Sequence, residues 1–584
     1  MLPEINVISQ TRDVVEAFAG YNHTDNTKDN QFYNMTNLTS DNYPVLSARK
    51  KRELIKEIIK PNALVYTDTL AYVDGTELYY GQNKICDLTD SEKTLVTMGA
   101  YLVVFPDKIA VNTSTGDFFE LEAHYSSAGT VKIEPCTYEG AVLSYSISEP
   151  EHVNGAYWLD NGVLKMWSET YSAWTSVATS YVRISEYIDG QINEHFTDGF
   201  EEGDTITISG FDNDDYNGDF LLYKSDIYMV IAAETIMLED ESISIDRTVP
   251  DMDYIIELNN RLWGCKDHEI YASKLGDPTN WKSYANQVSD SYAVTVGSYG
   301  EFTGAIKYNG SAIFFKEGTI IQIYGTQPSN FNLIENCFSG VEKGSSKSLA
   351  VLNGILYYKS KEGIMAYSGG KPSLISNALG QVFVNAVGGV TNSKYYVSMQ
   401  DETGNYHLFN YDTEKGIWIR EDSTHVKYFA NNAGNLYMVT GNELYVLRNK
   451  SGKMACPSVY VIINGESVGL CPGMFCPGQI FGDDYEETIE WSAETGDITC
   501  GYPDTKYVSK ITLRLLVEDT FEMEIMYDGD DVWERILAIG KTKKKSVSIP
   551  VMIRRCDYFR LRMSGKGNFK LYSITKSVER GSEP

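Results

Sequence analysis

The sequence is short of basic residues and has no long hydrophobic run. Its 584 residues include 80 Asp and Glu against 50 Lys and Arg, which gives a formal net charge of −30 and a pI of about 4.7. Such an acidic chain is unsuited to gripping nucleic acid through a basic surface. No stretch approaches the roughly 18 consecutive apolar residues of a membrane-spanning helix. The start, Met1–Leu2–Pro3–Glu4, lacks the basic region of a signal peptide. We therefore expect neither membrane insertion nor secretion.

Cysteine is sparse and scattered along the chain. The nine residues are Cys86, Cys136, Cys265, Cys337, Cys456, Cys471, Cys476, Cys500 and Cys556. Only Cys471 and Cys476 lie close together, and their spacing fits neither a CxxC redox pair nor a usual zinc knuckle. We predict free, buried thiols in a chain made in a reducing cytoplasm, with a local disulfide as the alternative.

The usual marks of catalysis and of cofactor binding are missing. The seven histidines are dispersed, and the sequence has no HExxH, GxSxG, GxxxxGK[ST] or strand-linked GxGxxG motif. The run DNDDYNG (212–218) departs from a calcium loop at the fifth and twelfth positions, where Tyr216 and Tyr223 stand, so a polar turn is favoured. We predict no catalytic residue, no cofactor, no metal and no enzyme activity. A glycosidase remains an alternative, because sequence cannot show the separation of two carboxylates.

Tyrosine and glycine are abundant, with 42 and 48 residues. A pattern of two short apolar runs around an Asn-Gly, Asp-Gly or Glu-Gly type of turn recurs along the chain. The seven copies span 63–81, 94–112, 254–273, 305–325, 349–369, 394–413 and 426–447. Such repeats are typical of radial β-architectures. We predict an all-β chain with a β-propeller of six to seven blades, and β-sandwiches with irregular spacing are the alternative.

Changes in composition divide the chain into five parts. They are an extended N-terminal arm (1–60), a β-propeller (61–122 and 251–450), an inserted β-barrel or sandwich domain (123–250), a connector (451–482) and a C-terminal antiparallel β-sandwich (483–584). The arm is rich in Asn, Asp and Thr and is expected to lie on a neighbouring surface. Its predicted anchors are Phe18, Tyr21, Phe32, Tyr33 and Tyr43. The insertion is predicted because its gap is too long for a loop.

Two basic clusters stand out in this acidic chain and are the candidate interaction residues. They are Arg49, Lys50, Lys51 and Arg52 in the arm, and Lys543, Lys544, Lys545, Arg554 and Arg555 in the C-terminal part. The second cluster could bind phosphate. We favour a charged hairpin that offsets the acidic run 483–490 or the acidic patch of a neighbouring subunit.

Several segments of the sequence occur in the same order as in one protein family. SKLGDPTNW (273–281) is followed by AIKYNGSAIFFKEGTIIQIYG (305–325), by GSSKSLAVLNGILYYKSKEGIMAYSG (344–369) and by LIS (374–376). This succession resembles the tail nozzle or hub proteins of short-tailed bacteriophages, also called packaged-DNA stabilisation proteins. The opening TNLTSDNYPVLSARKKR and the C-terminal strands are similar to tail proteins of gut phages. The inserted domain is not covered by the resemblance.

The resemblance implies a virion tail protein made in the bacterial host cytoplasm. It implies a homo-oligomer, a hexameric ring around the DNA exit channel, that retains packaged double-stranded DNA without sequence-specific contact. It also implies docking to portal or adaptor proteins and to a tail fibre or plug. The acidic composition fits such a conduit independently, because a negative lumen repels the duplex. A receptor- or carbohydrate-binding tail-tip protein is the second hypothesis, with Trp158, Trp167 and Trp174 stacking on sugars. A β-propeller glycosidase is the third.

Overall fold

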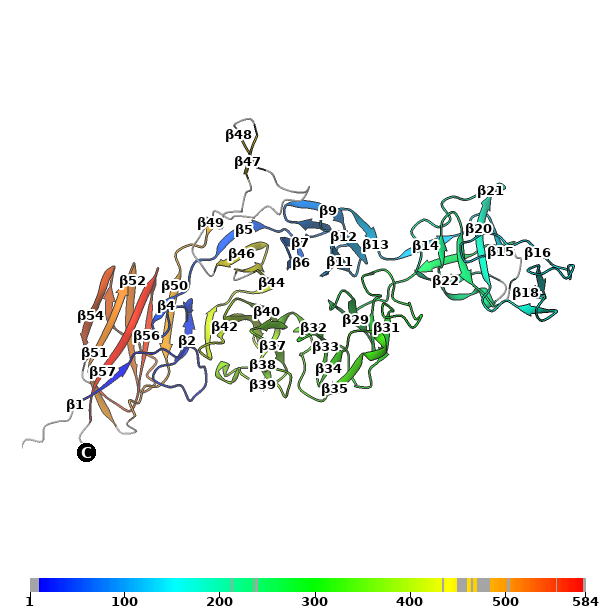
Figure 1. Ribbon diagram of the computed structural model, residues 1–584. Helices are drawn as coiled ribbons and strands as arrows, with labels where there is room; N and C mark the ends of the chain where they lie inside the picture. The colour runs from blue at the N-terminus through cyan, green and yellow to red at the C-terminus, as the bar shows by residue number, and fades with distance from the viewer. Residues whose placement is uncertain are drawn as a thin grey trace, which may run out of the picture.

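The fold was determined from a computed structural model, which describes residues 10–211, 214–234, 236, 240–432, 435–448, 460–463, 466–469, 484–501, 505–552 and 554–580. Three β-modules lie in a row (Figure 1): a sandwich, a propeller and the inserted domain. No helix of the described residues is long and apolar enough to cross a bilayer. The helical turns there are η1 (Asp214–Tyr216), η2 (Pro328–Asn330), η3 (Ser346–Ser348) and η4 (Asn377–Leu379).

The central module is a seven-bladed propeller. Blades 1 and 2 contain β6 (Pro61–Tyr66), β7 (Leu70–Asp74), β8 (Glu77–Tyr80), β9 (Asn83–Asp87), β10 (Thr94–Met98), β11 (Tyr101–Phe105), β12 (Ile109–Asn112) and β13 (Phe118–Glu120). Blades 3 and 4 contain β28 (Tyr254–Glu257), β29 (Leu262–Lys266), β30 (Glu269–Ala272), β31 (Tyr292–Thr295), β32 (Gly304–Tyr308), β33 (Ser311–Lys316), β34 (Thr319–Tyr324) and β35 (Asn332–Asn336). Blades 5 and 6 contain β36 (Ala350–Leu352), β37 (Ile355–Ser360), β38 (Gly363–Tyr367), β39 (Ser373–Leu374), β40 (Phe383–Val390), β41 (Lys394–Asp401), β42 (Tyr406–Asp412) and β43 (Ile417–Asp422).

Blade 7 closes the ring with strands from two distant parts of the chain. It contains β44 (Val426–Asn432), β45 (Asn435–Thr440), β46 (Glu443–Arg448) and β5 (Glu53–Glu57), with β49 (Asp484–Tyr485) beside β5. The first strand of blade 7 contacts the first strand of blade 1, and β46 pairs with β5 from the N-terminal segment. The ends of the propeller are therefore joined by main-chain hydrogen bonds.

Each of the seven predicted hairpin copies forms part of one blade, so the predicted propeller is confirmed with seven blades. Local turn chemistry explains why these copies could be recognised. Asn309–Gly310 and Asn353–Gly354 connect paired strands, and all four residues have positive φ angles between 48° and 77°. Asn and Gly tolerate this backbone region, which two-residue hairpin turns require.

The inserted domain consists of three small sheets around a core of its own. The first sheet contains β14 (Ala123–Ser126), β27 (Ser244–Arg247), β22 (Thr205–Ser209) and β23 (Gly218–Leu221). The second contains β24 (Lys224–Ser225), β25 (Met229–Ala232), β20 (Tyr181–Ile188), β15 (Thr130–Cys136), β26 (Asp240–Glu241) and β21 (Gln191–Ile192). The third, called the tryptophan sheet below, contains β16 (Tyr145–Ser146), β17 (Tyr157–Asp160), β18 (Val163–Ser168) and β19 (Ala173–Ser176).

The C-terminal sandwich has two sheets, and both include strands of the N-terminal segment. The larger sheet contains β3 (Leu38–Thr39), β4 (Leu46–Ala48), β57 (Phe569–Arg580), β51 (Lys506–Val517), β54 (Thr542–Pro550), β1 (Gln10–Val15) and β55 (Arg555–Cys556). The smaller contains β2 (Phe32–Thr36), β50 (Glu490–Thr495), β56 (Phe559–Lys566), β52 (Thr520–Tyr527) and β53 (Glu534–Ile539). A separate hairpin joins β47 (Tyr460–Ile463) and β48 (Glu466–Gly469).

The N-terminal segment thus runs as an extended arm, but the surface on which it lies belongs to the chain's own sandwich. Strand β1 pairs with β57, and β2 pairs with β50. Phe18, Tyr21 and Phe32 are buried in one continuous core that also includes residues of blades 5 and 6. Tyr43, in contrast, is 43% exposed. The arm acquires its structure from partners more than 450 residues away, which local sequence patterns cannot reveal.

Most described cysteines are free, buried thiols, as predicted. Cys86, Cys136, Cys265 and Cys556 are buried. Cys337 differs from the prediction because it is exposed, and Cys500 is half-buried. The alternative of a disulfide between Cys471 and Cys476 lies outside the described residues, as does the rest of CPGMFCPG.

The junction of arm and propeller predicts a sensitive glycine. Gly20 has a φ of +77°, and a Cβ there would lie 2.3 Å from the carbonyl oxygen of Trp418 in blade 6. We expect Gly20→Ala to lower the midpoint of thermal unfolding clearly, because the added carbon pushes the arm off the blade.

Gly155→Ala is the matched control for this substitution. Gly155 has a similar φ of +81° but open space around it. It should therefore show only the left-handed backbone cost of about 1–2 kcal/mol. Equal shifts of the melting temperature in the two variants would contradict the close packing of the arm.

Candidate functional site

The predicted basic cluster of the arm is divided between an internal ion network and the surface. Arg49 donates to Glu486 at 2.6 Å from Nη1 to Oε2, and Arg52 Nη2 lies 2.9 Å from Glu421 Oε2 and 2.8 Å from Asp422 Oδ2. Both arginine side chains are less than 10% exposed. They join the arm, blade 6 and the start of the sandwich, and this role occupies their charge.

Charge compensation in this network is mutual. Burial alone would lower the pKa of Arg52, but the carboxylates of Asp422, Glu421 and Glu486 raise it above its usual range. Burial alone would raise the pKa of Asp422, but Arg52 lowers it below its usual range. The network stabilises the junction only while charges of both signs are present. Lys50 and Lys51, the other two predicted residues, are exposed.

The predicted C-terminal cluster also divides. Arg554 pairs with Asp530 at 2.5 Å from Nη2 to Oδ2, so its charge is offset within the sandwich, but by a residue outside the acidic run 483–490. Arg555 is exposed, and its Nε donates to Thr505 Oγ1 at 3.0 Å. Lys543, Lys544 and Lys545 lie exposed on β54, which is an edge strand of the larger sheet. Lysines on an edge strand also discourage unwanted strand pairing.

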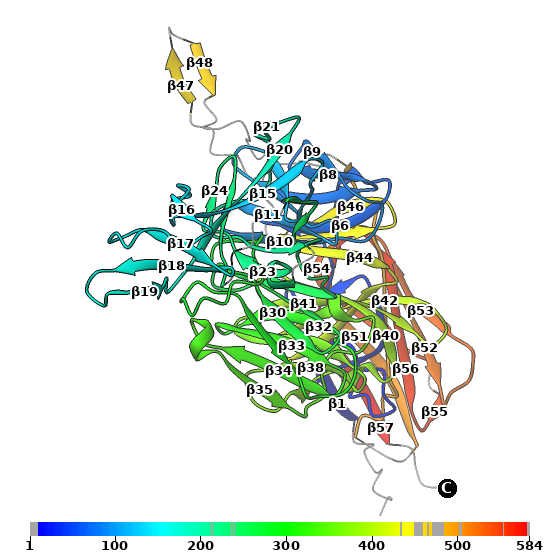
Figure 2. The same ribbon diagram turned by 90° about the vertical axis from the view of Figure 1, so that its right-hand side faces the viewer.

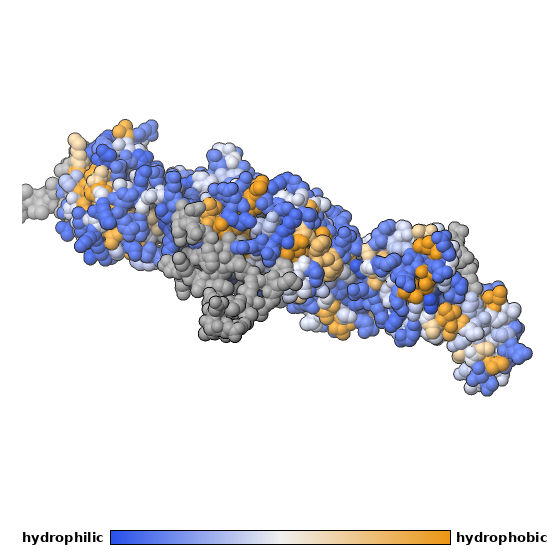
Figure 3. Space-filling view, turned by 90° about the horizontal axis from the view of Figure 1, so that it is seen from above, coloured by the Kyte–Doolittle hydropathy of each residue, from blue (hydrophilic) through white to orange (hydrophobic). Residues whose placement is uncertain are grey.

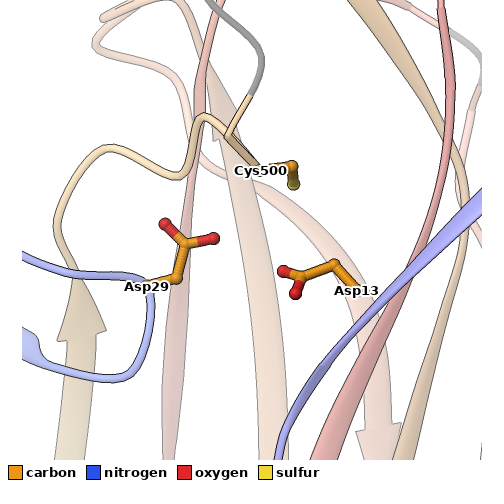
Figure 4. A group of neighbouring side chains, drawn as sticks. All are labelled: Asp13, Asp29 and Cys500. Carbon is orange, nitrogen blue, oxygen red and sulfur yellow. The ribbon is translucent and has the colours of Figure 1, made fainter.

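One group of potential metal ligands occurs among the described residues, and Figure 4 shows its carboxyl groups and thiol close together. Asp13, Asp29 and Cys500 have ligand atoms within 4.8 Å of one another. The buried ammonium of Lys576 lies 2.5 Å from Asp13 Oδ2 and 2.8 Å from Asp29 Oδ2. Burial raises the pKa of Cys500 to about 11, so its thiol stays protonated near neutral pH. This group is an ion-pair clamp that holds the arm on the sandwich, because Lys576 already supplies the cation.

The three tryptophans named from the sequence lie together on one face of the tryptophan sheet. The strand register places Trp167 opposite Trp174, and Trp158 opposite Lys165. The ring centroid of Trp174 lies 5.4 Å from that of Trp158 and 5.4 Å from that of Trp167. Glu149 accepts a hydrogen bond from Trp174 Nε1 at 3.0 Å. The sheet therefore presents aromatic rings and a carboxylate side by side.

This aromatic face is turned away from the core of the insertion. Leu159 and Leu164 on the opposite face are buried in that core. Figure 2 shows β17–β19 projecting to one side of the insertion, and Figure 3 shows hydrophobic residues at this end of the molecule. Neighbouring loops expose Ile147 and Tyr171 by 74% and 75%. A concentration of exposed aromatic and apolar groups is typical of a binding surface.

A cavity with several basic side chains lies between blades 1, 6 and 7 of the propeller. It has a volume of about 600 Å³, and its lining, which also includes connections between blades, contains Lys60, Glu92, Lys347, His425 and Lys427. The Lys347 ammonium lies 2.6 Å from Glu92 Oε1. Burial, Lys427 and Lys347 lower the pKa of His425, which indicates a positive local potential. The cavity is of a size that holds a small ligand.

Comparison with known proteins places the chain by fold only. No known protein family and no curated protein matches the sequence. BamB from Moraxella catarrhalis is 11% identical, with 70% of this chain and 99% of that chain covered and a TM-score of 0.29. Hsv2 from Kluyveromyces lactis is 12% identical, with 66% and 95% covered and a TM-score of 0.25. Neither is a phage tail protein, so the resemblance stated above stays a prediction.

The prediction that the chain is not an enzyme is corrected by these comparisons. The similar structures include an exo-β-1,3-galactanase from Phanerochaete chrysosporium, 10% identical, with 54% of this chain and 92% of that chain covered and a TM-score of 0.19. A glycoside hydrolase at 13% identity is another. Propeller-like folds thus carry catalysis in other proteins, and missing sequence motifs do not exclude it. At these identities the likeness concerns the fold alone.

The ion network gives a prediction for the junction of arm, propeller and sandwich. We expect Arg52→Met to lower the free energy of unfolding by about 3–5 kcal/mol, because the buried carboxylates of Glu421 and Asp422 lose their partner. Urea unfolding followed by tryptophan fluorescence measures this change.

Lys51→Met is the control for this substitution, since Lys51 is exposed. It should change the stability by less than about 0.5 kcal/mol. If both variants unfold at the wild-type urea concentration, the network does not stabilise the junction.

Proposed function

We propose that the chain is a structural subunit of a bacteriophage tail, a nozzle or hub protein that assembles as a ring around the DNA exit channel. The observation that carries this proposal is the continuous connection between sandwich and propeller. One hydrophobic core contains Tyr357 and Trp418 of the propeller together with Trp491 and Leu561 of the sandwich. Two modules that share a core move as one rigid body, which suits a component that transmits force.

The insertion is anchored to the propeller by buried polar contacts. Arg247, which is held by Asp204 of the insertion at 2.6 Å from Nη1 to Oδ2, donates from Nε to the carbonyl oxygen of Leu121 in the propeller segment at 3.2 Å. Asn280, in the loop after β30, donates to the carbonyl oxygen of Gly203 at 2.9 Å. These bonds fix the insertion against blades 2 and 3. A rigid row of three modules can span the distance between an adaptor or portal on one side and a fibre or plug on the other.

The charge of the chain supports passage of DNA without attachment. With a net charge of −30, a ring of such subunits repels the phosphate backbone. Repulsion is screened beyond about 8 Å in physiological salt, so the duplex is centred in the channel and not excluded from it. The ring retains packaged DNA through its bore and its partners, with no sequence-specific contact.

Electron microscopy of the purified protein and of intact particles tests this proposal. We expect closed rings of one symmetry and the same density in the tail, next to the portal or adaptor. A monodisperse monomer that is never found in particles would contradict it.

The tryptophan sheet favours a carbohydrate-directed function as the second candidate, either binding at a tail tip or hydrolysis. Aromatic rings beside hydrogen-bonding groups suit the apolar faces and hydroxyl groups of sugars. The glycoside hydrolases among the similar structures fit this candidate in fold. For hydrolysis, the candidate catalytic carboxylate is Glu92, which lines the cavity between blades 1, 6 and 7.

A glycan array with the full chain tests the second candidate. We expect glycan binding to be lost in Trp167→Ala and in Trp174→Ala, because each substitution removes an aromatic ring on which the apolar face of a sugar would stack. Tyr299→Ala, a 96% exposed aromatic residue in the propeller, is the control and should leave binding unchanged. Absence of any glycan signal, together with absence of glycan turnover in wild-type protein and Glu92→Gln alike, would remove the carbohydrate function.

A further inference from the structure

The outer face of the larger sandwich sheet is polar and positively charged. On β51 the side chains of Lys510, Thr512 and Arg514 point outward, because Ile511 and Leu513 between them are fully buried. Their cross-strand neighbours are Ser577, Thr575 and Ser573 on β57 and Pro550, Ser548 and Ser546 on β54. The central rows of this face therefore carry hydroxyl groups and cations and no carboxylate.

Further cations extend this face, which we call the cationic sheet face. Arg12 on β1 lies opposite Ser577, and Lys570 on β57 lies opposite Leu516. Lys544 on β54 lies over the ring of Tyr572 at 3.7 Å. The face thus consists of Arg12, Lys510, Arg514, Lys544 and Lys570 with the intervening Ser and Thr residues. Within the described chain, none of these five cations forms an ion pair.

The opposite sheet of the sandwich shows that this lack of partners is specific to one face. There Arg560 pairs with Asp497 at 2.5 Å, Arg562 with Glu524 at 2.7 Å and Lys566 with Glu490 at 2.6 Å. Cations of the smaller sheet are thus neutralised inside the module. The five cations of the cationic sheet face remain available to an external anion.

The matching negative charge lies at the other end of the molecule. Residues 123–250 contain 23 acidic and 5 basic residues, a net charge of −18 out of −30 for the whole chain. Of the five basic residues, Lys132, Lys165, Lys224 and Arg247 already pair with carboxylates of the insertion. Figure 1 places the sandwich and the insertion at opposite ends of the row. The two charges cannot meet within one molecule.

We infer that the cationic sheet face binds the acidic insertion of a second copy of this chain. Such a contact joins two different surfaces, so it is head-to-tail, and repeated contacts of this kind form a ring when the rotation from copy to copy closes. Charge complementarity between polar surfaces sets the partner and the register. A second copy is favoured as the occupant, because the insertion of each copy gathers −18 of the −30 charges into 128 residues at the end of the molecule that its own sandwich cannot reach. The inference rests on the proposed ring and names the contact that builds it.

Charge reversal on the sheet face tests this contact in the full chain. Lys510→Glu/Arg514→Glu should weaken self-association about tenfold or more in mass photometry, because like charges then oppose each other. Lys307→Glu/Lys371→Glu at two exposed positions of the propeller is the matched control with the same change in net charge, and it should associate as the wild type does. Unchanged thermal unfolding of both variants confirms that they fold. Equal association of the two variants would overturn the inference.

Site-specific crosslinking identifies the surface that is bound. A photo-reactive p-benzoylphenylalanine at the exposed Ser548 should form crosslinks to residues 123–250 of another copy. Crosslinks to other parts of a second copy would overturn the inference. It would also be overturned if the wild type binds duplex DNA and Lys510→Glu/Arg514→Glu loses this binding but still self-associates. Rings in particles with crosslinks elsewhere would refute this contact and leave the proposed function standing. Crosslinks to residues 123–250 in a protein that is never found in phage particles would support the contact and refute the proposed function.

Discussion

Main-chain pairing of the N-terminal segment with distant strands is the constraint on which the rest of the structure depends. Strand β5 completes blade 7 beside β46, while β1 and β2 extend the two sandwich sheets beside β57 and β50. One short segment therefore closes the propeller and fastens the sandwich to it. Closure leaves no open edge in the propeller ring, and the shared core removes the hinge that two separate domains would have.

Charge reinforces this arrangement where the backbone changes direction. Arg49 and Arg52 neutralise carboxylates of blade 6 and of the sandwich, and Lys576 neutralises Asp13 and Asp29. These internal pairs occupy Arg49 and Arg52 of the arm, whereas Lys50 and Lys51 stay on the surface. The remaining charge is divided between a strongly acidic insertion and one cationic sheet face at the other end, and this polarity is what a subunit needs to recognise its own copies in one orientation.

The sequence could predict the features that depend on neighbouring residues. Hairpins with turns such as Asn309–Gly310 are local, so seven blades could be located from their pattern. It could not predict that Arg52 is buried, because Glu421 and Asp422 are distant along the chain. The three tryptophans could be listed from the sequence, but the sequence did not show that they share one face of a sheet, because that depends on the register of β17–β19. Of the cationic sheet face, only Lys544 was named from the sequence, although the alternation of apolar and polar residues in ITLRLLV already indicated one solvent-facing side of β51.

Hydrogen–deuterium exchange of the intact chain tests most directly whether the N-terminal segment unites propeller and sandwich. The account predicts that amides of β1, β2 and β5 exchange as slowly as those of β57, β50 and β46, and that all become exposed in one cooperative step as urea is raised. Rapid exchange throughout residues 10–57, with the propeller and the sandwich still protected, would contradict it.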